Sequence, residues 1–253
     1  MKPLIVANWK CNPTTRGEAQ QLFQSVQKGI KNIKNVEVII CPPFIYIPKF
    51  QHSNIPTIKL GAQDVFWEGK GAFTGEISPL MLKNLGCKYV IIGHSERRRY
   101  LKETDEMINR KLKTALKFNL RPILCVGDKS RESKEDIKEI DLQLKKDLKG
   151  LEKSTLSKLI ITYEPIWAIS TTRASVVATP EDARKGALYI KKTLDKLFGK
   201  DSAQKIKILY GGSVNGKNIN SFIYDAQMDG VLVGAASLDS REFVKIVKNV
   251  NRA

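Results

Sequence analysis

The stretch Tyr89-Val90-Ile91-Ile92 is apolar at every position, and the polar segment Gly93-His94-Ser95-Glu96-Arg97-Arg98 follows it directly. A strand with one solvated face alternates apolar and polar residues, whereas a strand of a parallel sheet is covered on both faces and stays apolar throughout. The run Val38-Ile39-Ile40-Cys41 has the same character. These runs predict buried strands of a parallel sheet.

Short apolar runs alternate with longer helical patterns along the whole chain. We predict strands at residues 4–8, 36–41, 57–62, 89–93, 121–126, 159–164, 207–211 and 230–233. We predict that a helix follows each strand, at residues 16–30, 44–50, 78–85, 104–118, 134–149, 180–198, 215–224 and 238–250. Eight strand–helix units without a break in composition predict an α/β fold in which residues 1–253 form a single-domain (β/α)8 barrel. A doubly wound open sheet is the alternative arrangement.

The composition is that of a globular protein with a large core, since 42% of the 253 residues are apolar. No apolar window is long enough to span a bilayer, and the N-terminus lacks a signal-peptide pattern, so we expect a cytoplasmic protein without a membrane partner. The four cysteines are widely spaced and only two histidines are present. We therefore expect reduced thiols and no metal site.

The formal net charge of +17 first suggests a nucleic-acid partner. The lysines are scattered, however, over amphipathic stretches such as residues 137–151 and 188–198, where they indicate solvated helix faces. No element combines clustered basic residues with interleaved aromatic ones, so we expect no nucleic-acid binding. A positive field would instead attract small anions and speed their encounter with the protein.

Polar residues lie at the predicted carboxyl ends of the strands, which converge on one mouth in a barrel. They are Asn8, Lys10, His94, Glu164, Gly211-Gly212-Ser213 and Gly234. Glu164 follows a buried strand and precedes Pro165, so its carboxylate is held against protein and is placed to act as a base; a buried ion pair is the structural alternative. Asn8 and Lys10 are two residues apart, so an extended chain would direct both side chains to the same face.

Six segments in order carry a resemblance to a known family. They are Ala7-Asn8-Trp9-Lys10, Gly61-Ala62-Gln63-Asp64, the run from Gly71 to Pro79, Gly93-His94-Ser95-Glu96-Arg97-Arg98, the run from Tyr163 to Ile169, and Tyr210-Gly211-Gly212-Ser213-Val214. Together they closely resemble the triosephosphate isomerase family over nearly the whole chain. The resemblance implies a TIM barrel that interconverts dihydroxyacetone phosphate and D-glyceraldehyde 3-phosphate, in glycolysis and gluconeogenesis, without a cofactor.

The resemblance also implies roles for individual residues. The family is the type case of a glutamate base paired with a neutral histidine electrophile, which implies these roles for Glu164 and His94. A helix that begins after His94 would disfavour the imidazolium form, in agreement with a neutral ring. Lys10 would stabilise the enediolate and the phosphate by its charge, Asn8 would assist beside it, and Glu96 would orient its neighbours.

By the same resemblance, Ser213, Gly234 and Ala235 bind the substrate phosphate, together with Ser170 of a lid. The family usually has two glycines where this chain has Gly234-Ala235. The family's short lid has two glycines around a threonine, whereas residues 168–178 are longer and contain no glycine. This departure predicts slower or leakier turnover, with methylglyoxal formed as a by-product. The alternative function is a phosphate-binding barrel whose isomerase activity is impaired by the altered lid.

The loop from Gln63 to Pro79 is long and contains three glycines. A long loop in a compact domain is usually functional, and in the family it docks into a second subunit. The resemblance therefore implies a homodimer. Thr74 would then complete the neighbour's site, Glu76 would pair with Arg97 across the interface, and Cys11 would lie in the pocket that the loop encloses.

Overall fold

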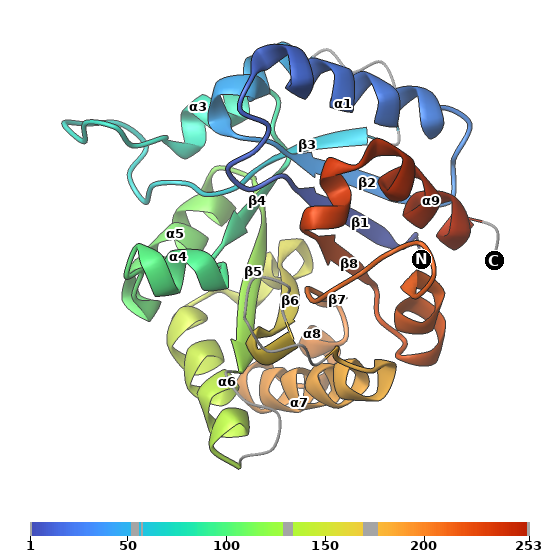
Figure 1. Ribbon diagram of the computed structural model, residues 1–253. Coiled ribbons are helices and arrows are strands. Elements are labelled where there is room, and N and C mark those ends of the chain that lie inside the picture. Colours follow the sequence, from blue (N-terminus) through green and yellow to red (C-terminus); the bar gives the residue numbers. More distant parts are fainter. Residues whose placement is uncertain (1, 52–55, 57, 129–133, 169–176, 252–253) are drawn as a thin grey trace.

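The computed structural model describes residues 2–51, 56, 58–128, 134–168 and 177–251. Eight strands form a closed barrel in chain order, and each pair of neighbours is parallel, the last strand with the first included (Figure 1). The strands are β1 (Leu4–Asn8), β2 (Glu37–Cys41), β3 (Ile58–Ala62), β4 (Tyr89–Ile92), β5 (Arg121–Asp128), β6 (Ile160–Pro165), β7 (Lys207–Tyr210) and β8 (Gly230–Val233). The predicted (β/α)8 barrel is confirmed, and the alternative open sheet is excluded because β8 pairs with β1.

Helices cover the outer surface of the barrel (Figure 1). The α-helices are α1 (Arg16–Gly29), α2 (Ile47–Phe50), α3 (Pro79–Asn84), α4 (Ser95–Tyr100), α5 (Asp105–Lys117), α6 (Lys134–Asp147), α7 (Pro180–Phe198), α8 (Lys200–Ala203) and α9 (Ser240–Asn251). Shorter helical segments are η1 (Phe44–Tyr46), η2 (Lys153–Lys158), η3 (Ile166–Ala168), η4 (Ser221–Asp225) and η5 (Ala235–Leu238). None of the helices in the described ranges is long and apolar enough to cross a membrane. Cys11, Cys41, Cys87 and Cys125 are free thiols.

Two predicted helices are wrong in detail, and each has a local cause. Residues 44–50 form a 3-10 turn and one turn of α-helix, because Pro48 has no N–H to donate to the carbonyl of Phe44. Residues 215–218 form a turn in which the Asn215 side chain accepts hydrogen bonds from the N–H groups of Lys217 and Asn218. Such side-chain bonds compete with helix formation, and a π-helix begins only at Ser221. The helix expected to begin after His94 is present as α4, whereas the prediction did not separate α8 from the helix before it.

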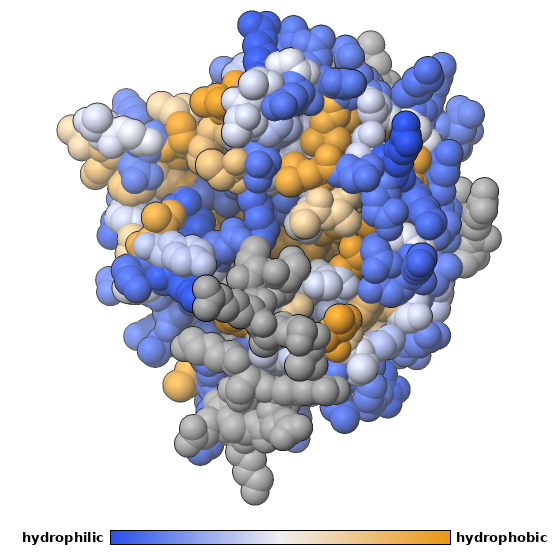
Figure 2. Space-filling model, in the orientation of Figure 1, coloured by the Kyte–Doolittle hydropathy of each residue, from blue (hydrophilic) through white to orange (hydrophobic). Residues whose placement is uncertain are grey.

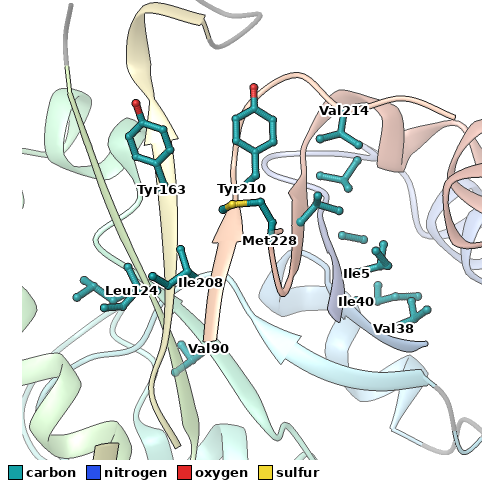
Figure 3. Close-up of a cluster of buried hydrophobic side chains, with 14 of the residues drawn as sticks. Ile5, Val38, Ile40, Val90, Leu124, Tyr163, Ile208, Tyr210, Val214 and Met228 are labelled. Atoms are coloured by element: carbon teal, nitrogen blue, oxygen red, sulfur yellow. The ribbon is translucent and has the colours of Figure 1, made fainter. Parts of the chain in front are cut away.

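The core has two layers, one inside the barrel and one between the strands and the helices. The inner layer consists of Leu4, Val6, Ile39, Cys41, Tyr89, Ile91, Ile123, Cys125, Ile160, Leu209 and Leu232. Tyr163 and Tyr210 are register partners on β6 and β7, and their rings lie side by side in the outer layer (Figure 3). Successive side chains of a strand alternate between faces, so Glu164 shares the inward face with Ile160. The barrel thus directs Glu164 into its own mouth.

A buried cluster of charges links the loop after β3 to the helices that follow β4. The Lys111 ammonium lies 2.7 Å from Asp64 and also contacts Glu103, and all three side chains are buried. Arg97 of α4 contacts the same two carboxylates at 2.8 and 2.6 Å. Burial raises the pKa of Asp64, and Lys111 opposes that shift. Two cations thus compensate two carboxylates that would be costly to bury alone.

We predict that Lys111→Met lowers the free energy of unfolding by about 3–5 kcal/mol, because it leaves buried carboxylates without one of their cations. Urea denaturation measures the change. Lys113→Met on the exposed face of α5 is the matched control and should have little effect. Equal stability of the two variants would contradict the importance of the cluster.

Candidate active site

A cavity of about 420 Å³ opens at the carboxyl ends of the strands. Its lining includes Asn8, Lys10, Asn12, His94, Glu164, Gly211, Gly212, Ser213, Gly234 and Ala235. The structure therefore brings together, from the ends of three different strands, the acidic side chain, the imidazole and the ammonium that the sequence singled out. Substrate sites of (β/α)8 enzymes occupy this end of the barrel.

Glu164 belongs to β6 itself, and its side chain is only 2% exposed. One carboxylate oxygen accepts a hydrogen bond from the Ser95 N–H at 2.9 Å. The other lies 3.1 Å from Nε2 of His94. Gly211 provides room beside it, since a Cβ at position 211 would lie 3.0 Å from Cγ of Glu164 and 2.6 Å from Thr162. The carboxylate is thus fixed by neighbours on β4, α4 and β7.

His94 is the residue that caps the N-terminus of α4. Its Nδ1 accepts a hydrogen bond of 3.2 Å from the Glu96 N–H. A ring nitrogen that accepts a hydrogen bond carries no proton, so the geometry assigns the proton to Nε2, the nitrogen facing Glu164. The ring is then neutral and can donate from Nε2, which agrees with the form expected from the sequence.

The backbone conformation of Lys10 differs from the one expected from the sequence. The strand ends at Asn8, and Lys10 has a φ of 54°, so the expectation that an extended chain aligns the two side chains is wrong. The Lys10 N–H instead donates to Oδ1 of Asn8 at 3.0 Å, and its ammonium contacts Glu96 at 2.5 Å. Gly234 leaves room for the stem, because a Cβ there would lie 3.3 Å from Cε of Lys10. The expected role of Glu96 in orienting its neighbours stays a prediction, and the structure shows its contact with Lys10.

Gln63 is a supporting residue that the sequence analysis did not assign to the site. Its side-chain amide donates to the carbonyl of Lys10 at 2.8 Å and to the carbonyl of Cys41 at 2.9 Å. It thereby ties the left-handed backbone of Lys10 to the end of β2. The sequence carried two signals for it, its place directly after β3 and its membership of the family-like segment Gly61-Ala62-Gln63-Asp64.

Another part of the cavity wall is formed by the residues that follow the last two strands. Gly211-Gly212-Ser213 follows β7, and Gly234-Ala235 follows β8. Ala235 opens the 3-10 helix η5 and has no positive φ, so its Cβ is tolerated where a glycine was expected. The Ser213 hydroxyl donates to the carbonyl of Ala168 at 3.3 Å. Ser170 and most of the predicted lid lie outside the described residues.

Arg98 links the backbone that follows β4 to two carboxylates. Its guanidinium donates to the carbonyl of Gly93 at 2.8 Å and to Asp105 and Asp147 at 2.6 Å each. Asp147 is fully buried, and its second oxygen has no hydrogen-bond partner among the described residues. Burial raises the pKa of Asp147 to about 7, although Arg98 pulls it down. The carboxyl that anchors Arg98 therefore titrates near neutral pH.

Comparisons with known proteins agree with this geometry. Residues 3–250 match the family described as Triosephosphate isomerase. A relative from Dictyoglomus turgidum is 45% identical over 98% of this chain and 99% of its own length, and one from Dehalococcoides mccartyi is 49% identical over 98% and 96%. A third, from Caldanaerobacter subterraneus, is 46% identical over 97% and 98%. All three are named Triosephosphate isomerase.

The raised pKa of Asp147 predicts a pH-dependent stability. Because its pKa is about 7 in the folded chain and about 3.9 in an unfolded one, the folded state binds an extra proton between these values. The contribution of Asp147 to stability is therefore largest at low pH and is lost as pH rises to 7. The difference in unfolding free energy between wild type and Asp147→Asn should fall over that range, as urea denaturation at several pH values would show. A difference that rises with pH would contradict the assignment.

Proposed function

We propose roles for the cavity residues from the premise that this chain belongs to the triosephosphate isomerase family. Members of the family interconvert dihydroxyacetone phosphate and glyceraldehyde 3-phosphate, and this chain is an isomerase of glycolysis and gluconeogenesis with a triose phosphate substrate. The chemistry removes a proton from the carbon beside a carbonyl and returns it to the neighbouring carbon. These steps require a base and groups that stabilise the negative charge on the substrate oxygens.

Glu164 is the base in this proposal. Both of its oxygens already have neighbours, the Ser95 N–H and the His94 ring, so the carboxylate exchanges these contacts for the substrate when it takes the proton. One carboxylate above the plane of the enediolate can remove the proton from one carbon and deliver it to the other. The burial of Glu164 supports this role, since a carboxylate shielded from water is not solvated at the moment of transfer.

His94 and Lys10 stabilise the negative charge that develops on the substrate oxygens. His94 donates from Nε2 to the carbonyl oxygen and moves a proton between the two oxygens while the carbon proton is transferred. Lys10 provides a fixed positive charge, held by Glu96 on its ammonium and by Asn8 on its backbone. The neutral ring of His94 supports the assignment, because a neutral imidazole can both donate and accept in this cycle.

In this proposal the substrate phosphate is bound by Ser213, Gly234 and Ala235. Asn8 and Lys10 lie beside it, and Ser170 contributes from the lid. Backbone N–H groups in glycine-rich turns can approach an anion closely. The observation that carries the proposal is that Glu164, His94 and Lys10 line one cavity. Family membership favours an active isomerase over the alternative of an inactive phosphate-binding barrel.

The homodimer is also a proposal, and the loop between β3 and α3 supports it. The loop projects from the barrel at the left of Figure 1, and it is internally ordered by a hydrogen bond of 2.8 Å from Phe66 to Ile77 and by the packing of Phe66 on Phe73. Apolar residues gather on this side of the molecule in Figure 2. The exposed large apolar residues on the loop and on α3 are Phe73, Leu80 and Met81. An ordered apolar projection fits a socket on a second copy.

The contacts proposed at that interface involve exposed residues. Thr74 and Glu76 are exposed on the loop and Cys11 is exposed beside the mouth, so each is available to a second copy. Arg97 already pairs with Asp64 and Glu103, and Glu76 of the partner would join that cluster. We also propose that residues 1–253 act as one domain in the cytoplasm.

Glu164→Asp tests the base. The shorter side chain withdraws the carboxylate by about 1 Å, and a misplacement of that size can cost about 100-fold in kcat. A coupled isomerase assay measures the loss, and a wild-type Tm would show that the fold is retained. Near-normal turnover would remove Glu164 from the role of base without touching family membership.

Phe73→Glu with Met81→Glu tests the homodimer. Two carboxylates on the proposed interface should convert a dimer to a monomer in sedimentation velocity at micromolar concentration, because a buried unpaired charge is costly. Leu142→Glu with Leu188→Glu, at exposed leucines of α6 and α7, is the matched control and should leave the dimer intact. A monomeric wild-type chain would refute the proposal directly.

A further inference from the structure

A second cavity, of about 810 Å³, lies on the flank of the barrel between α1 and α9. These helices lie next to each other in Figure 1 because closure of the barrel brings the first and last units together. The cavity is lined by Ser25, Lys28, Gly29, Lys31, Asn32, Ile33, Ser240, Arg241, Val244 and Lys248. None of these residues lines the substrate cavity, so the feature is separate from the catalytic machinery.

The close approach of the two helices shapes this groove. A Cβ at Gly29 would lie 2.4 Å from Val244, so the end of α1 is seated against the middle of α9. Arg241, Val244 and Lys248 follow the i, i+3, i+7 spacing of one helix face. Lys28 lies in the last turn of α1. The groove thus contains apolar Ile33 and Val244 between two basic rims. One rim consists of Lys28 and Lys31, and the other of Arg241 and Lys248.

The four cations of the rims lack the compensation that other basic residues of this chain have. Lys28, Lys31, Arg241 and Lys248 are exposed, no carboxylate lines the groove, and none of the four forms an ion pair with a carboxylate of the described residues. By contrast, Lys145 contacts Asp141 at 2.6 Å on α6.

The carboxylates near the groove are engaged elsewhere. Asp239 accepts hydrogen bonds from the N–H groups of Arg241 and Glu242 at the start of α9. Glu242 in turn accepts from the Gly216 N–H at 2.6 Å. Glu18 of α1 forms a capping box with Thr15. As far as the described residues go, the groove therefore keeps an uncompensated positive charge.

The spacing and the lining define the ligand that would fit. Arg241 and Lys248 are seven residues apart, or about 10 Å along the helix, so a ligand with several negative charges along its length can pair with both. No aromatic side chain lines the groove, which disfavours nucleic acid, since bound bases stack on aromatic rings. We propose that the α1–α9 groove binds an extended polyphosphate chain, whose successive charges pair with the basic residues of both rims.

The test is a calorimetric titration of the full chain with inorganic tripolyphosphate at low ionic strength. Arg241→Gln with Lys248→Gln removes two charges from the groove and should weaken binding at least about tenfold. Lys191→Gln with Lys192→Gln removes the same charge from the exposed face of α7 and should change it by less than about twofold, because α7 lies elsewhere on the barrel.

Four outcomes would overturn the proposal. Equal losses in the two variants would assign binding to net charge rather than to the groove. Unchanged binding in the groove variant would place the ligand in the substrate cavity. Tighter binding of a single-stranded DNA with the same number of phosphates would assign the groove to nucleic acid. Absence of wild-type binding at low ionic strength would reject it as well.

Discussion

The first turn of α4 is the constraint on which the whole site depends. The Ser95 N–H donates to Glu164, the Glu96 N–H donates to His94, and the Glu96 carboxylate holds the ammonium of Lys10. The first N–H groups of any helix have no partner within it, so they remain available to side chains from other strands. A helix of only six residues, placed directly after β4, thereby positions groups from β1, β4 and β6.

In this arrangement the Glu164 carboxylate already has partners within the protein, which a substrate would have to replace. Hydrogen bonds to a charged group contribute about 1.5–3 kcal/mol each, so moving the Glu164 carboxylate away from Ser95 and His94 has a substantial cost. Interactions with the remote phosphate can offset that cost, because binding energy away from the reacting carbons can be used to reorganise the catalytic groups. In the proposed mechanism, phosphate binding and the movement of Glu164 are then coupled energetically, and Gly211 already lies beside Glu164.

The barrel could be predicted from the sequence, as could the candidate residues that the structure brings into one cavity, but the way in which each is held could not. Apolar runs such as Tyr89-Val90-Ile91-Ile92 predict strands covered on both faces, and alternation from Ile160 places Glu164 correctly. The left-handed backbone of Lys10 carried no signal, because no glycine marks it. The Gln63 side chain binds the carbonyl of Lys10, which is 53 residues away in the chain, and that of Cys41, which is 22 residues away. Local sequence patterns cannot reveal such contacts.

The placement of the positive charge follows from the same physics as the site. Where cations are buried, as Lys111 is, or partly buried, as Arg98 is, carboxylates contact them, because an unpaired buried charge is not tolerated. The excess of +17 must therefore reside on the surface, where water and salt screen it. Along α1 and α9, barrel closure forces two basic rims together, and their mutual repulsion opposes that closure. An anion between the rims would remove the repulsion, so the same contact that closes the barrel also favours a ligand on its outer flank.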